Sequence, residues 1–147
     1  MELRAITDAD LPTFYEHQAD PAVSAMAGFK PRSHDAFFVH WRTKVLADPA
    51  NTRFAVVADG VLAGNVVAFD REGKRLVGYW YGRAHWGRGI ASEALRRFLT
   101  LETQRPLCAW VIPSNRASMR VLEKHGFVRG ELRVDHEGVE ELLFTLL

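Results

Sequence analysis

The feature that most constrains the fold is a change of hydrophobic period across a glycine-rich segment in the middle of the chain. Residues 75–81 (RLVGYWY) are apolar and aromatic, as in a β-strand. Residues 90–101 carry apolar side chains at every fourth position along two neighbouring rows, as in an amphipathic helix. Between them, residues 82–89 hold three glycines and two arginines. A glycine turn from a strand into a helix presents bare N–H groups and a positive helix end to an anion.

The remaining elements place this turn inside an α/β (α+β) fold. Two dipeptides with hairpin-turn chemistry, Asp59-Gly60 and Glu72-Gly73, join the strand at 75–81 to two preceding strands. Six further strands are predicted at residues 2–6, 53–58, 61–69, 106–112, 127–134 and 139–147. Helices are predicted from Thr7 through Tyr15, within 20–31, from Ser33 to before Pro49, at 90–101, and from Ser114 to Lys124. This order predicts one domain, residues 1–147, around a mixed sheet that is antiparallel early and linked by helix crossovers later.

Composition excludes several classes of protein. The 147 residues are 48% hydrophobic, enough for a core without disulfides or metals. Nineteen Lys and Arg against 18 Asp and Glu argue against a nucleic-acid-binding surface. The single cysteine, Cys108, and six histidines without a ligand-spaced pair predict no metal site. Since no export signal and no apolar run of about 20 residues is visible, we expect a cytoplasmic monomer or homodimer that binds no membrane.

Several kinds of turn share this strand–turn–helix pattern. Gly82 and Gly87 have the separation found in a P-loop, but Arg88 stands in place of its lysine and Gly89 in place of its serine or threonine. A dinucleotide-binding fingerprint fits less well, because Ser92 stands where its third glycine or alanine belongs. A tight turn without any ligand is also compatible with these glycines. The turn alone therefore leaves these alternatives open.

Two longer signatures resemble the GNAT family of N-acetyltransferases. Gly89-Ile90-Ala91 fits the G-x-G/A half of its pyrophosphate loop, and residues 79–95 (YWYGRAHWGRGIASEAL) resemble the branch that contains ribosomal-protein N-terminal acetyltransferases. Residues 115–127 (NRASMRVLEKHGF) resemble the second signature of that branch, an N-x-x-S helix ending in E-K-x-G-F. The resemblance is specific over residues 76–128 and architectural elsewhere. It implies acetyl transfer from acetyl-CoA to a primary amine, of a protein, a peptide or a small molecule, by direct attack in a ternary complex.

The resemblance also implies where acetyl-CoA, as co-substrate, binds. The sheet of such folds is splayed, and acetyl-CoA enters between the strands expected here at 75–81 and 106–112. Backbone groups of Tyr79, Trp80 and Tyr81 would pair with pantetheine like an added strand. The pyrophosphate would lie on the N–H groups of the turn, namely those of Trp86, Gly87, Arg88, Gly89, Ile90 and Ala91. We expect the Arg88 side chain to contact phosphate and the Trp86 indole to pack the turn, whereas Arg83 fits phosphate and solvent equally well.

The same resemblance assigns roles on the helix that begins near Ser114. Asn115 would hydrogen-bond the pantetheine arm, or alternatively cap the helix. Ser118 would donate to the departing thiolate, or alternatively serve as a small packing residue. Ser118 and Tyr79 are the expected catalytic residues, with a backbone N–H of the 79–81 strand as oxyanion donor.

Two positions depart from the family pattern. Leu122 stands where many members carry a tyrosine acid, and Leu76 where relatives often carry a glutamate. The base is therefore unassigned among the polar residues near the splayed strand, which are Asp70, Glu72, Tyr79 and His85. The departures keep a second hypothesis open, a non-catalytic CoA-binding sensor or interaction domain.

The acceptor pocket is predicted only in outline. The helix that starts at Ser33 and the loop before it are where this fold usually gates the acceptor. Phe29, Phe37 and Trp41 are the aromatic candidates for its lining, with core packing as the alternative.

Overall fold

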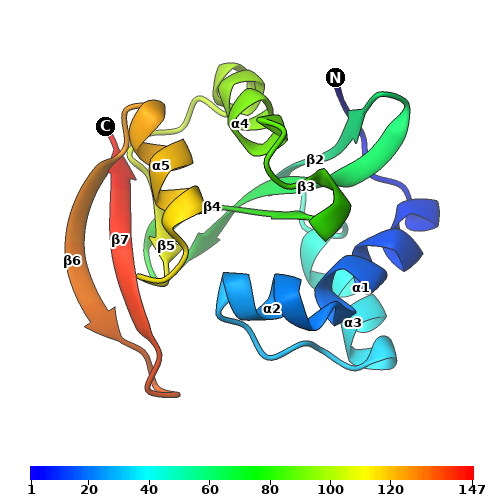
Figure 1. Cartoon of the computed structure of the whole chain (residues 1–147), viewed down its shortest axis with the longest axis horizontal. Helices are drawn as coiled ribbons and strands as arrows, with labels where there is room; N and C mark the ends of the chain where they lie inside the picture. The colour runs from blue at the N-terminus through cyan, green and yellow to red at the C-terminus, as the bar shows by residue number, and fades with distance from the viewer.

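Seven strands form one mixed sheet in the computed structural model, which describes residues 1–147 (Figure 1). The strands are β1 (Glu2–Arg4), β2 (Thr52–Ala58), β3 (Val61–Arg71), β4 (Lys74–Tyr81), β5 (Leu107–Val111), β6 (Val128–Val134) and β7 (Glu140–Leu146). Their order in the sheet is β1-β2-β3-β4-β5-β7-β6, and every neighbouring pair is antiparallel except β4 and β5. The predicted mixed, mostly antiparallel sheet is thereby confirmed.

The helices are α1 (Leu11–Ala19), α2 (Pro21–Ala27), α3 (His34–His40), α4 (Ile90–Leu101) and α5 (Arg116–Lys124). After α3 the chain continues through one wide turn, in which the Leu46 N–H donates to the Trp41 carbonyl at 2.9 Å. The sequence predicted an ordinary helix there. The cap of α5 is Asn115, whose Oδ1 accepts from the Ser118 N–H at 3.2 Å. This agrees with the capping alternative for Asn115 and not with a helix that begins at Ser114. Serine and asparagine cap helices about equally well, so residue type could not decide between them.

The two predicted hairpin turns are confirmed by their backbone angles. Asp59 and Gly60 have φ values of 52° and 76°, and Glu72 and Gly73 have 51° and 74°. Positive φ at both central residues is the type I′ geometry that matches the twist of the strands. The first three long strands therefore form a meander in the middle of the sheet.

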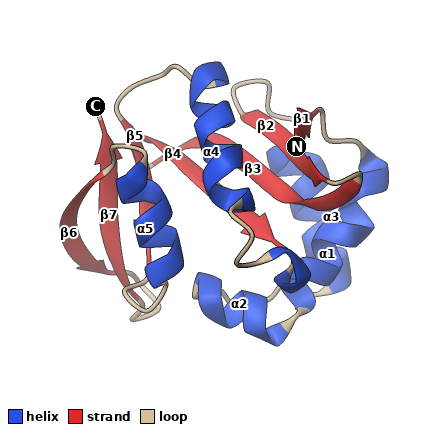
Figure 2. Ribbon diagram, turned by 45° about the horizontal axis from the view of Figure 1, so that its top comes forward, coloured by secondary structure: helices blue, strands red, loops and turns tan.

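Helices cover both faces of the sheet (Figure 2). On one face α4 and α5 enclose a core that includes Val66, Phe98, Leu122 and Phe144. On the other face α1 and α3 cover a smaller core that includes Leu11, Phe37 and Trp41 against Val67 of β3. Neighbouring residues such as Val66 and Val67 serve opposite cores because side chains alternate along a strand. None of the helices is both long enough and apolar enough to cross a bilayer.

The sheet opens between β4 and β5. These two strands pair at Arg75 with Leu107 and at Leu76 with Cys108, and no pairing continues toward their carboxyl ends. At the closed end the buried Arg75 Nε donates to Glu102 Oε1 at 2.6 Å, which ties β4 to the end of α4. The splayed sheet is thus confirmed, and residues 77–81 of β4 keep a free edge.

Candidate functional site

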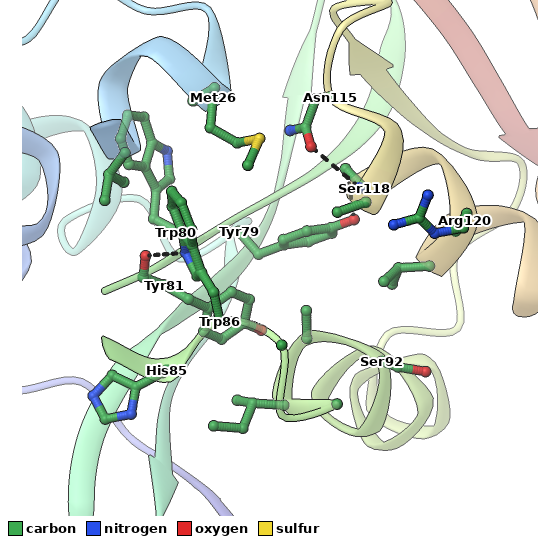
Figure 3. A pocket seen from close by; sticks show the side chains of 18 of the residues that line it. Met26, Tyr79, Trp80, Tyr81, His85, Trp86, Ser92, Asn115, Ser118 and Arg120 are labelled. Atoms are coloured by element: carbon green, nitrogen blue, oxygen red, sulfur yellow. Dashed lines mark hydrogen bonds between the residues drawn. The ribbon is translucent and has the colours of Figure 1, made fainter. Parts of the chain in front are cut away.

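A cavity of about 450 Å³ lies where β4 and β5 part (Figure 3). It is lined by residues from α2, β4, the glycine turn, α4 and α5, and 11 of the 19 lining residues are hydrophobic. Ten of the eleven residues expected to bind the cofactor line it, namely Tyr79, Trp80, Tyr81, Trp86, Gly87, Gly89, Ile90, Ala91, Asn115 and Ser118. The exception is Arg88. The two sequence signatures, about 30 residues apart, therefore meet around one space.

The glycine turn gives the cavity a row of free N–H groups. No N–H of residues 87–92 donates to another backbone carbonyl, and α4 begins at Ile90 behind Gly89. Gly87 and Gly89 have φ values of 73° and 74°, and a Cβ at either would meet nothing within 4 Å. The Trp86 N–H was expected to be free as well, but it donates to the Arg83 carbonyl at 3.1 Å. The available donors thus begin at Gly87.

The arginines of the turn are held by carboxylates instead of facing the cavity. Arg88 was predicted to contact phosphate, but its guanidinium donates to Asp59 of the β2–β3 turn at 2.6 Å. Arg83 makes two bonds, of 2.9 and 3.0 Å, to Asp20, which also caps α2. The Trp86 indole donates to the Tyr81 carbonyl at 3.2 Å and packs the turn as predicted. The positive field at the turn in this structure therefore comes from the helix end and not from these side chains.

The two expected catalytic residues meet across the cavity. Tyr79 Oη lies 2.7 Å from Ser118 Oγ, so a hydrogen bond joins β4 to α5 (Figure 3). Burial of the phenol raises the pKa of Tyr79 to about 12, and its bond to Ser118 opposes this in part. Tyr79 therefore keeps its proton at neutral pH and can donate it. Leu122 is fully buried in the core, so it leaves the space beside Ser118 to the phenol.

Asn115 lies at the same end of the cavity, and its side chain bonds to the backbone of α5. Its Oδ1 caps α5 through the Ser118 N–H, which leaves the amide N–H groups of its side chain free. The capping alternative is therefore correct in this structure, and it is compatible with a bond from the amide to a ligand. Nearby, the buried Tyr81 hydroxyl has no hydrogen-bond partner, and burial raises its pKa above the ordinary value for tyrosine.

Sequence reasoning missed two cations that line the cavity. Arg120 and Lys124 lie one turn apart on α5 and share the cavity face with Ala117. Neither lies three or four residues from Asn115 or Ser118, so the N-x-x-S signature alone did not place them on the cavity face. They are the arginine and the lysine of the cavity lining.

For two of the three aromatic candidates for the acceptor pocket, the core-packing alternative is correct. Phe37 and Trp41 are only 4% and 8% exposed and belong to the core under α1. The cavity wall is supplied instead by α2, through Val23, Met26 and Ala27. Phe29, in the loop after α2, is half exposed, and its ring centroid is 5.9 Å from that of Trp80.

Close packing of the loop explains why α2 reaches the cavity. A Cβ at Gly28, which caps α2, would lie 2.6 Å from the Ile112 side chain just after β5. Only glycine allows this approach, and it also allows the φ of 74° found there. The end of α2 thus packs against Ile112, just after β5, while the Phe29 ring packs against Trp80 of β4.

The candidates for a base are mostly placed away from the cavity. Asp70 bonds Arg75 at 3.3 Å and Glu72 bonds Arg133 at 2.9 Å, both at the hairpin end of β4. Leu76, where relatives often carry glutamate, is buried. Of the residues considered, only His85 and Tyr79 line the cavity, and no aspartate or glutamate does. No group of three potential ligand side chains is arranged to hold a metal ion.

A sheet that opens between two parallel strands, with free N–H groups and a hydroxyl pair at the opening, defines the class of acyltransferases that the sequence signatures indicate. A family model described as an acetyltransferase (GNAT) domain matches residues 1–128. The chain therefore belongs to the GNAT acetyltransferase family, and it is an acyltransferase.

Known proteins agree with this assignment. The chain is 26% identical over 167 residues to an uncharacterized N-acetyltransferase, p20, of Bacillus licheniformis, across 100% of this chain and 92% of that protein. The spermidine N-acetyltransferase of Vibrio cholerae, solved with CoA and spermine, has a TM-score of 0.83 at 19% identity, over 99% and 94% of the two chains. RimL, a ribosomal-protein alpha-N-acetyltransferase solved with coenzyme A, has a TM-score of 0.81 at 16% identity, over 99% and 92%. These two structures share the fold of this chain.

Proposed function

We propose that this enzyme transfers an acetyl group from acetyl-CoA to a primary amine by direct attack within a ternary complex. The observation that carries the proposal is the Tyr79–Ser118 hydroxyl pair, which lies in the same cavity as the free N–H groups of the glycine turn. The solved neighbours with CoA or with CoA and spermine support CoA as the co-substrate. The cavity needs no metal for this reaction.

Coenzyme A would bind mainly through backbone groups. The pyrophosphate lies on the N–H groups of residues 87–91, at the positive end of α4. Arg120 and Lys124 add charge from α5, in the place expected for Arg88. The pantetheine amides pair with the free edge of residues 77–81, and the Asn115 amide bonds the same arm.

The transfer itself balances without a covalent enzyme intermediate. The amine nitrogen attacks the thioester carbonyl carbon, and backbone N–H groups of β4 stabilise the oxyanion that forms. The C–S bond then breaks, and the thiolate takes a proton from the Ser118 hydroxyl, which Tyr79 resupplies through the hydrogen bond between them. The amine gives up its own proton to water or to His85, which lines the cavity, and water returns a proton to the Tyr79 phenolate to complete the cycle.

Calorimetry with CoA tests the proposed cofactor site. We expect Gly89→Glu to abolish CoA binding, because a carboxylate at φ 74° would fill the open space that the phosphates occupy. Gly138→Glu is the matched control: Gly138 has φ 81° and open space around it, but it lies in the β6–β7 turn. Equal CoA affinity in Gly89→Glu and the wild type would contradict the assignment of the loop.

Release of free thiol from acetyl-CoA then tests the reaction. A panel of peptides, polyamines and aminoglycosides should include at least one acceptor that accelerates thiol release above the rate of hydrolysis. If CoA binds and no acceptor does so, acetyl transfer is contradicted.

A further inference from the structure

A hydrogen bond between His125 and Ser92 joins the end of α5 to the first turn of α4 beside the cavity. His125 follows the last residue of α5, and its Nε2 lies 2.9 Å from Ser92 Oγ. Ser92 is the third residue of α4 and lines the cavity (Figure 3). The histidine therefore contacts the cavity wall through this serine, although it is not itself part of the lining.

Ser92 continues the row of free donors in the glycine turn. Its backbone N–H donates to no backbone carbonyl, like those of the residues before it. Its hydroxyl makes no hydrogen bond other than the one to His125. Both groups are thus available to an anion at the positive end of α4, which is where the proposed site holds the pyrophosphate.

The bond between the two side chains can run in either direction. A neutral imidazole with its proton on Nδ1 accepts the Ser92 hydrogen at Nε2. If that hydrogen is donated to a phosphate oxygen instead, His125 must donate from Nε2 to the Ser92 oxygen. An imidazolium donates from both nitrogens, so a bound phosphate favours the protonated ring.

The surroundings of His125 disfavour its protonation as long as no anion is bound. Burial and the ammonium of Lys124 lower the pKa of His125, and the charge of Arg96 adds to this. A bond to the Ser92 backbone and the carboxylate of Glu93 oppose the lowered pKa only in part. Glu93 itself is paired with Arg96 at 2.5 Å. His125 is therefore mostly neutral at pH 7.

The other charged side chains of α5 do not supply a counter-charge for the ring. Glu123 is paired with Arg129 of β6 at 3.4 Å, and Arg120 lines the cavity as Lys124 does. No aspartate or glutamate lines the cavity. A phosphate bound at the turn would thus bring to His125 the negative charge that the protein does not provide.

Resting on the proposed binding of CoA, we infer that His125 is a further part of the pyrophosphate site: it takes up a proton from solvent as the pyrophosphate binds, and it orients the Ser92 hydroxyl toward a phosphate oxygen. In the complex, His125 donates to Ser92 and Ser92 donates to the phosphate. His125 is thus a positioning residue, and it couples CoA binding to pH. Because the complex holds more protons than the free enzyme, binding becomes tighter as the pH falls.

Calorimetry with dephospho-CoA tests this inference. This ligand keeps the pyrophosphate but lacks the 3′-phosphate, whose own titration near neutral pH would add to the signal. We expect the affinity to be about fivefold higher at pH 6 than at pH 8, because one group gains a proton on binding. Titrations in buffers of different ionisation enthalpy should show proton uptake. NMR of the wild-type imidazole should show a raised pKa of His125 in the complex, and this measurement needs no variant.

Three variants assign the proton to His125. His125→Gln keeps an N–H that can donate to Ser92 but cannot be protonated, so it should bind dephospho-CoA as the wild type does at pH 8 and lose the gain at pH 6. Ser92→Ala breaks the chain of bonds and should weaken binding at both pH values. His136→Gln is the matched control, because the His136 side chain is 88% exposed in the β6–β7 turn, and it should keep the full gain.

The outcomes separate this inference from the proposed function. An equal gain at pH 6 in His125→Gln and the wild type would overturn the inference and assign the proton to another group, such as His85, which lines the cavity beside Arg88. A wild-type affinity that does not change with pH would also overturn it and would leave acetyl transfer standing. If the wild type binds neither CoA nor dephospho-CoA at any pH, the proposed function itself is contradicted.

Discussion

Tyr79 and Ser118 come from β4 and α5, and their hydrogen bond of 2.7 Å spans the opening of the sheet. A serine hydroxyl alone is a poor proton donor, because the alkoxide that it would leave is strongly basic. A second hydroxyl that donates to it removes this difficulty, since a proton can pass along the pair as the first one leaves. The pair can thus act as the proton donor in place of the tyrosine acid, because this chain has Leu122 at the position of that tyrosine.

Substitution of the pair should separate catalysis from binding. We expect Ser118→Ala to lower kcat on the order of 10²-fold with an unchanged CoA affinity, because the donor to the thiolate is lost. Tyr79→Phe keeps the ring and should cause a loss of kcat of the same order, since Ser118 without the phenol is a poor donor. Steady-state kinetics with calorimetry on both variants measures these losses. Wild-type kcat in Ser118→Ala would rule out the relay.

The helix α5 combines a structural and a binding role at its first residue. Asn115 caps the helix through the Ser118 N–H, so any loss of the cap also frees Ser118. Asn115→Ala should lower the free energy of unfolding by about 1 kcal/mol, the usual cost of removing a cap, and should weaken CoA binding. Asn115→Asp keeps a capping oxygen but has no amide N–H, so it should retain the stability and still bind CoA more weakly. Urea unfolding and calorimetry distinguish the two, and tight CoA binding by Asn115→Asp would contradict the bond to pantetheine.

At the level of elements, hydrophobic period was enough to predict most of the fold. The strand of 75–81, the helix of 90–101 and the type I′ turns agree with the structure because each depends on neighbouring residues. The partner of Arg88 was missed because Asp59 lies 29 residues away in sequence, and only the packing of the β2–β3 turn brings it close. The place of α2 in the cavity wall depends likewise on Gly28 fitting against Ile112. Local patterns carry no information about such contacts.

For the molecule as a whole, the opening between β4 and β5 requires that the strands stay joined at the other end. Only two residue pairs link them, and beside these pairs the ion pair between Arg75 and Glu102 ties β4 to the end of α4, from which the chain leads into β5. Its side chains are 5% and 7% exposed, and Arg75 also contacts Asp70 at 3.3 Å and Thr52 at 3.2 Å. Breaking it should therefore affect both stability and the geometry of the cavity.

Glu102→Gln tests this dependence. A buried arginine left without its partner usually costs about 3–5 kcal/mol, and we expect a loss near the lower end because Asp70 remains beside Arg75. Saturating CoA should restore about 2.7 kcal/mol at a hundredfold excess over its Kd, since it binds only the folded state. Glu93→Gln is the control, because Glu93 pairs with Arg96 and Arg97 on the exposed face of α4 and its loss should change stability little. Urea unfolding of both variants with and without CoA measures these effects. Equal stability of Glu102→Gln and Glu93→Gln would show that the two residue pairs hold the sheet closed without the ion pair.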